Sequence, residues 1–216
     1  MALNPNDELN VLNREEDYKR RAVPFPEFYR PMGIGREQKE RRIKAAERLS
    51  DVFAAALWLA RPDNEMAVAN VGMMLMYLQS ELMKAYADIT DRYEMQWYRE
   101  HASDVINEVT DATQRHIDDP YFTSDDRADL IAENEANSLI GYDELQNAID
   151  AGFTLKTWNG MLDKRERDSH IAMEGTTIPI EQPFDVNGSF LMMPGDWQFN
   201  PDPAEVVNCR CWLTFS

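Results

Sequence analysis

The residues whose types and spacing could do chemistry lie mostly in one short stretch, WNGMLDKRERDSHIAMEG at residues 158–175. If this stretch is helical, Asp163, Arg167 and His170 fall at spacings of four and three and share one face. A carboxylate beside an imidazole can orient and charge it, as a general base requires. The same spacing also produces a salt-bridged surface, and short charge runs are usually solvated faces. We therefore favour a structural role for this cluster.

An enzymatic role is the alternative interpretation of the same residues. His170 would act as the base, and Asp163 would orient it. The arginines nearby in the chain or in the fold would bind a phosphate group: Arg165, Arg167 or Arg210. This hypothesis predicts a phosphate-handling hydrolase or transferase. The chain lacks a glycine-rich phosphate cradle and a known nucleophile motif, so we favour this function less.

The only two cysteines, Cys209 and Cys211, lie close to the end of the chain in the run NCRCWLTFS. On a strand, residues two apart project to the same side, so both sulfurs should face one way. Two thiolates with His170 and one acid could hold zinc, but a second cysteine pair is missing. Free cysteines are among the most buried residues. We therefore favour core cysteines and no cofactor, with zinc as the alternative.

Charge is distributed unevenly along the 216 residues, whose formal net charge is −17. Residues 1–61 are nearly neutral, whereas residues 62–152 hold 20 Asp and Glu against 5 Lys and Arg. Such an acidic body repels phosphate backbones, so direct nucleic-acid binding by it is not expected. The basic residues of 36–48 alternate with acids, which favours a salt-bridged helix face over a DNA-binding one.

The sequence predicts neither a membrane-spanning protein nor a secreted one. No apolar run approaches the roughly 18 residues that a membrane helix needs, and the longest is VFAAALWLA at residues 52–60. The first residues, MALNPNDELN, show no basic segment followed by an apolar run, so we expect no secretory signal. Two cysteines in a chain of this length suit a protein made in a reducing cytosol.

The elements that position these residues are predicted to be mostly helical. Residues 1–35 are predicted to be an extended arm, because closely spaced prolines block helices and central strands. The apolar side chains of the arm are expected to dock on a neighbouring subunit: Phe25, Phe28, Tyr29 and Met32. Residues 36–122 are predicted to be a helical body, with one helix at 36–60 and one or two over 64–117, broken near 88–91.

Residues 123–216 are predicted to form a separate module. Two helices are expected in 123–152, divided at Gly141 and closed by Gly152. From residue 153 the pattern changes to short alternating segments, which predicts a small unit of strands and turns. The expected fold class is therefore α+β, with a largely helical N-terminal body of long helices and a small C-terminal domain with short strands.

The order of motifs in the C-terminal part resembles the head-morphogenesis family of phage minor head proteins, typified by the F protein of phage Mu. The resemblance covers about residues 130–213, where the family shows an acidic helix, K-x-W, D-x-R-x-R-x-x-H, a glycine turn, P-F, P-G-D and N-C-R-C. The matching residues that we expect to matter most are Trp158, Asp163, Arg165, Arg167, His170, Gly175, Asn208, Cys209, Arg210 and Cys211.

The resemblance implies a structural virion protein rather than an enzyme. Members of the family bind the portal and are linked to head morphogenesis and to genome packaging, retention or ejection. We therefore expect a chain made in the host cytoplasm and placed in the head near the portal vertex. Its expected partners are the portal protein, the major capsid protein or further copies of itself. In this interpretation the motif residues stabilise a small domain through contacts with one another.

Overall fold

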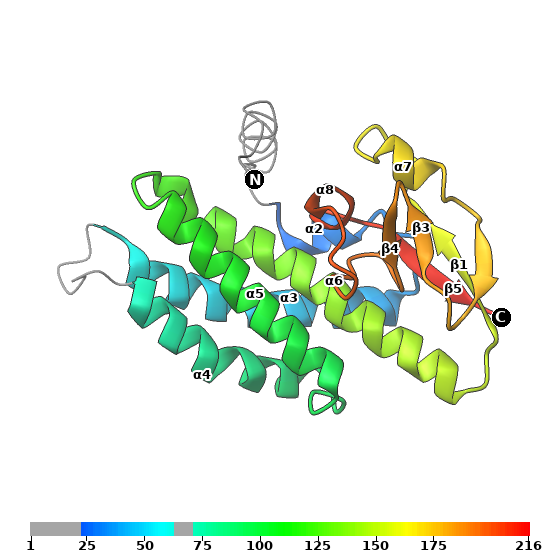
Figure 1. Ribbon diagram of the computed structural model, residues 1–216, viewed down its shortest axis with the longest axis horizontal. Coiled ribbons are helices and arrows are strands. Elements are labelled where there is room, and N and C mark those ends of the chain that lie inside the picture. The colour runs from blue at the N-terminus through cyan, green and yellow to red at the C-terminus, as the bar shows by residue number, and fades with distance from the viewer. Residues whose placement is uncertain (1–22, 63–70) are drawn as a thin grey trace, which may run out of the picture.

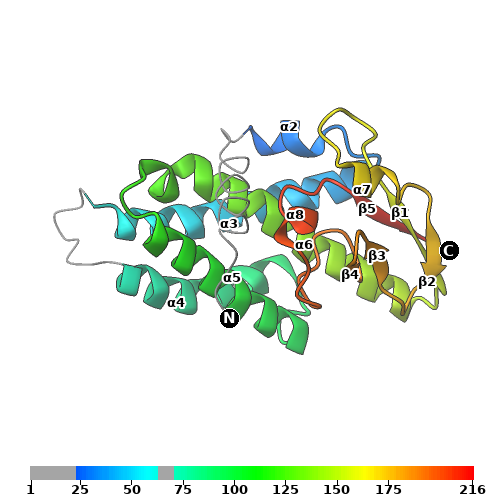
Figure 2. The ribbon, with the colours of Figure 1, turned by 45° about the horizontal axis from the view of Figure 1, so that its top comes forward.

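The computed structural model describes residues 23–62 and 71–216. Its longest elements are four helices: α3 (Arg36–Ala60), α4 (Val71–Ile89), α5 (Gln96–Arg115) and α6 (Asp125–Asp150). The strands follow α6 and gather at one end of the helices (Figures 1 and 2). Long helices followed by a few short strands confirm the predicted α+β class.

The helices α3 and α6 form the centre of the helical part. α3 occupies the residues predicted for it, packs against both α6 and α4, and buries a stripe that includes Leu49, Val52 and Phe53. The segment 64–117 contains two helices in its described part, and α4 and α5 are separated at residues 90–95. At this break the Thr90 hydroxyl accepts a hydrogen bond from the Arg92 backbone and donates one to Asp143.

The helix α6 is continuous, so the prediction of two helices divided at Gly141 is wrong. A glycine inside a helix costs only about 1 kcal/mol, and packing of α6 along α3 outweighs that cost. Ser124 caps the start of the helix by accepting a hydrogen bond from the Arg127 backbone at 3.2 Å. Gly152 follows its end with a φ of +82°, as expected for a glycine that closes a helix.

Two small antiparallel sheets lie against the end of this helical part. The first has the order β2–β1–β5, formed by β2 (Thr177–Pro179), β1 (Leu155–Asn159) and β5 (Trp212–Phe215). The second is a hairpin of β3 (Phe184–Val186) and β4 (Ser189–Leu191). Short helices complete this part: α7 (Asp168–Ile171) and α8 (Pro203–Val206). β1 therefore joins the segment after α6 to the last residues of the chain.

The predicted arm is only partly within the described residues, and there it differs from the prediction. Residues 1–22 lie outside the described part, and Phe25–Tyr29 form the short helix α2, with its prolines at and beside the helix start. Phe28, Tyr29 and Met32 are 3%, 0% and 1% exposed in the chain's own core. Phe25 is half-buried against the same core.

The expected docking of these side chains on a neighbouring subunit is therefore wrong for the three buried ones. Their apolar area is already removed from water by this chain, with α2 packed on α3. The Tyr29 hydroxyl also donates a 2.8 Å hydrogen bond to the backbone carbonyl of Glu133 in α6. Phe25 is left with a partly exposed ring, and its contact with a partner stays a prediction.

One apolar core runs through the whole described structure, from Phe28 through the four long helices to Leu213 in β5. The helix α6 contributes to this core in the helical part, where it packs on α3, and in the C-terminal part, where it contacts β5. The boundaries proposed at residues 35 and 122 stay predictions. Within the described ranges, no helix has the length and apolar character needed to cross a membrane.

A buried ion pair, His101 with Glu135, joins α5 to α6. Its Nε2 and Oε2 atoms are 2.7 Å apart, and the Tyr86 hydroxyl donates to the same oxygen at 3.3 Å. Burial disfavours the imidazolium, but the Glu135 carboxylate, with smaller contributions from Asp196 and Asp104, more than offsets this and raises the pKa of His101.

The raised pKa of His101 predicts that stability depends on pH. The pair stabilises the fold fully below about pH 6.5, the ordinary histidine pKa. This contribution is lost as pH rises through the folded-state pKa. We expect a loss of about 1.4 kcal/mol for each pH unit between the two pKa values. Urea unfolding of the wild type and His101→Gln from pH 6 to 9 measures it. An equally steep decline in both proteins would contradict this assignment.

Candidate functional site

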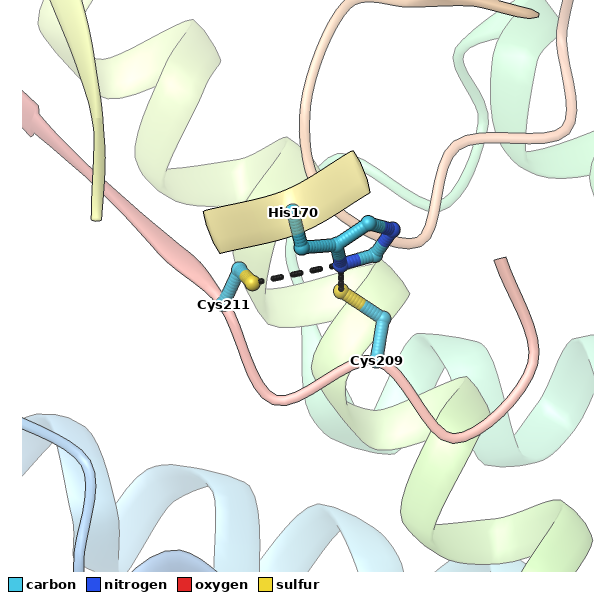
Figure 3. A group of neighbouring side chains, drawn as sticks. All are labelled: His170, Cys209 and Cys211. Carbon is cyan, nitrogen blue, oxygen red and sulfur yellow. Dashed lines mark hydrogen bonds between the residues drawn. The ribbon is translucent and has the colours of Figure 1, made fainter. Parts of the chain in front are cut away.

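The structure brings His170, Cys209 and Cys211 together in the C-terminal part. The cysteine sulfurs lie 3.6 Å (Cys209) and 3.4 Å (Cys211) from the same ring atom, His170 Nδ1. Figure 3 shows both sulfurs pointing toward this nitrogen from the segment that precedes β5. All three side chains are buried, and both cysteines are free thiols. We call this group the His–Cys cluster.

The opposite nitrogen of the His170 ring is held by Glu205, which lies in α8. Nε2 is 3.1 Å from the Glu205 backbone carbonyl and 3.3 Å from its Oε2 atom. The Glu205 carboxylate in turn accepts hydrogen bonds from Ser169 at 2.7 Å and Asn187 at 3.1 Å. Trp158 from β1 packs its ring against the imidazole at 84°, with the centroids 5.5 Å apart. These contacts fix the orientation of the imidazole in the core.

The protonation of the His–Cys cluster follows from the close approach of its three polar groups. A hydrogen bond from Cys211 holds the pKa of Cys209 well below its ordinary value despite burial, and His170 adds to this effect. The pKa of Cys211 is raised by its hydrogen bond to Cys209 and by burial. Burial opposes the charge on His170, but the neighbouring Cys209 raises the pKa of the imidazole. The three groups therefore lower the pKa of one thiol, Cys209, and raise the pKa of the other thiol and of the imidazole.

Asp163 does not orient His170, which corrects the general-base interpretation. Its carboxylate binds the Arg210 guanidinium through two hydrogen bonds of 2.8 and 2.7 Å, and these lower the pKa of Asp163. The helix α7 begins only at Asp168, so Asp163 and Arg167 do not share a helical face with the imidazole. The spacing argument fails because residues 160–167 form turns and loop rather than helix.

The other residues of the motif have structural contacts. Arg167 precedes α7 and donates a hydrogen bond to the Val207 carbonyl, while the Arg165 side chain is exposed. Gly175 has a φ of +72°, and its N–H donates to the Trp158 carbonyl at 3.0 Å. Asn208 also has a positive φ of 59°, and its N–H donates to the Asn134 side chain. These contacts shape the loops around the cluster.

The sequence did not predict the contacts of several residues that hold the site in place. Asn137 in α6 donates to the Cys209 carbonyl at 3.3 Å. Lys156 in β1 is buried, donates to the Met192 carbonyl at 2.7 Å, and has its pKa lowered to about 8 by burial. A polar residue among apolar ones in a helix or strand indicates that its side chain is buried and hydrogen-bonded. This pattern does not reveal which residue is the partner, and here the partners are 36 and 72 residues away.

The space beside the His–Cys cluster is small. It is lined by residues 161, 165–167, 170 and 208–211 and has room for about one water molecule. The space is too small to enclose a substrate that carries a phosphate group. The arrangement can hold a loop closed or bind a single ion.

Comparison with known proteins identifies one family. The family model described as "Phage Mu protein F like protein" matches residues 32–214. Searches of the curated proteins and of the solved structures found no significant match.

Proposed function

Because the chain belongs to the phage Mu protein F-like family, we propose that it is a structural protein of a phage head that contacts the portal or the major capsid protein. The family points to a head-morphogenesis protein and to a place in the virion. Our proposal further includes a position at the portal vertex, the contact with one of these partners, and a part in genome packaging, retention or ejection. The match over residues 32–214 is the observation that carries it.

The geometry of the site supports a structural role. The polar groups of the family motif are mostly engaged with one another or with the backbone: His170 with Glu205, Asp163 with Arg210, and Arg167 with Val207. These contacts connect α7 and the residues just before it to α8 and the segment before β5, which lie 35 to 47 residues later in the sequence. Arg167 and Arg210, two of the proposed phosphate-binding arginines, are thus engaged in internal contacts, which argues against the hydrolase or transferase alternative.

The charge of the helical part supports a basic protein partner. Residues 62–152 hold 20 acidic against 5 basic residues. Many of the acids on the described helices are solvent-exposed, among them Asp88, Glu100, Asp104, Glu108 and Asp111. Complementary charge steers association and fixes the register of an interface. We therefore place the contact with portal or capsid on this acidic surface.

Cross-linking on intact particles tests this assignment. A zero-length carbodiimide joins carboxylates to lysine amines that already form ion pairs, so it reports an acidic surface against a basic partner. We expect coupling between carboxylates of α4 or α5 and lysines of the portal or major capsid protein, decreasing when particles are treated in high salt. Coupling only within this chain, with none to a head protein, would contradict the proposed interface.

A further inference from the structure

The His–Cys cluster has the donor atoms and the spacing of a metal site. We propose that His170 Nδ1, Cys209 Sγ and Cys211 Sγ bind a zinc ion, with the carboxylate of Glu166 as the fourth ligand. The three donor atoms lie within 4.8 Å of one another, and Glu166 Oε1 is 3.4 Å from the Cys211 sulfur. The site is independent of the proposed role in the phage head.

The distances between donor atoms agree with a tetrahedral zinc ion. Zn–S bonds of about 2.3 Å and Zn–N or Zn–O bonds of about 2.0–2.1 Å place neighbouring donors roughly 3.5–3.6 Å apart in a tetrahedron. The two S–N distances are 3.6 and 3.4 Å, and the S–O distance is 3.4 Å. These are three of the six edges of such a tetrahedron. Among the described residues, only His170, Cys209 and Cys211 have donor atoms that all lie within 4.8 Å of one another, so the Glu166 carboxylate would move closer to them when the ion binds.

The orientation of the imidazole also fits a metal ligand. A metal-binding histidine ordinarily donates its second ring N–H to a carbonyl or carboxylate, which fixes the ring and the tautomer. His170 meets this condition, because Nε2 faces both the carbonyl and the carboxylate of Glu205. Nδ1 faces the two sulfurs, as Figure 3 shows, so in this tautomer its lone pair is directed to them. Without a metal ion, the Cys209 thiol can donate to this lone pair while the Cys211 thiol donates to Glu166, whereas a metal ion uses both sulfurs as ligands.

The loop that carries the cysteines is held in place by other residues. Asn134 and Asn137 of α6 bind the backbone at Asn208 and Cys209. Between the two cysteines, Arg210 binds Asp163 through both of its terminal nitrogens. The sulfurs are therefore presented by a fixed backbone, and little order must be gained when an ion binds.

The donor set selects zinc among the common metals. Two thiolates and an imidazole are softer ligands than magnesium or calcium prefers, and an iron–sulfur cluster needs four ligands that are mostly cysteine. Zinc combines Cys, His and carboxylate ligands in tetrahedral sites. Four protein ligands close the coordination shell, so we assign the ion a structural role.

Titration of the reduced full chain with zinc alone tests the site. We expect one ion per chain, a raised Tm that chelation reverses, and the visible absorption of tetrahedral thiolate coordination when cobalt(II) replaces zinc. Cys211→Ser should keep the Tm of the metal-free wild type but lose the shift. Its affinity should fall by at least the roughly 10- to 100-fold seen when residues that only orient a ligand are changed.

His116→Gln is the matched control, because His116 lies at the end of α5 and is not among the proposed ligands; it should bind zinc like the wild type. If Cys211→Ser does not fold, the cobalt spectrum of the wild type decides. The proposal is overturned if the wild type with two titratable thiols takes up no zinc. It is also overturned if cobalt shows no thiolate coordination or if Cys211→Ser binds zinc as tightly.

Discussion

Trp158→Ala is expected to lower the free energy of unfolding by about 3–5 kcal/mol, the usual cost of removing a large buried aromatic side chain. Trp158 is fully buried and is among the largest such side chains of the protein. Its ring packs against Phe184 at 5.3 Å and His170 at 5.5 Å between centroids. The cavity would open between β1, the β3–β4 hairpin and α7, so the C-terminal part would lose its centre.

Trp158→Phe separates packing from hydrogen bonding at this position. The indole N–H has no hydrogen-bond partner among the described residues, so phenylalanine removes no bond and keeps most of the aromatic contact. We expect well under half of the loss seen with alanine, measured by urea unfolding monitored by circular dichroism. Equal losses in the two variants, or none in either, would contradict the packing assigned to this ring.

Arg42→Ala is the second change with a large expected effect, again a loss of about 3–5 kcal/mol. Arg42 in α3 is 1% exposed, and its guanidinium donates two hydrogen bonds of 2.9 and 2.8 Å to Glu144 in α6. A third hydrogen bond of 3.0 Å reaches Asn137, which holds the Cys209 carbonyl. Alanine would leave a largely buried carboxylate without its counter-charge. Urea unfolding measures the loss.

Two further variants test this explanation. Arg36→Ala removes an arginine–glutamate pair from the same helix, but one that is exposed on the surface, so little or no change is expected. Arg42→Met with Glu144→Leu removes both buried charges and should be more stable than Arg42→Ala alone. If Arg36→Ala costs as much as Arg42→Ala, or if the double variant is the weakest, burial of the charge is not the cause.

The elements with strong local signals could be predicted from the sequence. Residues 36–60 lack glycine and proline and have a clear apolar stripe, and α3 occupies those residues. Gly141 illustrates the limit, because a local helix-weakening residue is overridden by the contact of α6 with α3, about 100 residues earlier. Phe28 and Tyr29 illustrate it as well: a proline-rich segment has no apolar face of its own, but it folds onto a helix that the local pattern does not reveal.

The sequence predicted which residues belong to the candidate site, but it did not predict which of them contact one another. The family motif named His170, Cys209 and Cys211, which the structure places together. The expected partner Asp163 instead binds Arg210, because the turns at 160–167 direct it away from the imidazole. Glu205 takes that place from α8. The spacing of residues in the sequence predicts which side chains are neighbours only inside a regular helix or strand. These residues lie in loops and one-turn helices, so their contacts could not be predicted in this way.

Quantitative mass spectrometry of purified heads tests the central claim, a structural role in the phage head, most directly. The proposed role predicts that the chain co-purifies with heads through a density gradient. It should remain there after nuclease treatment, because the acidic helical part is not expected to be held by DNA. Recovery of the chain only in the soluble fraction of the lysate, with none in the heads, would contradict the account.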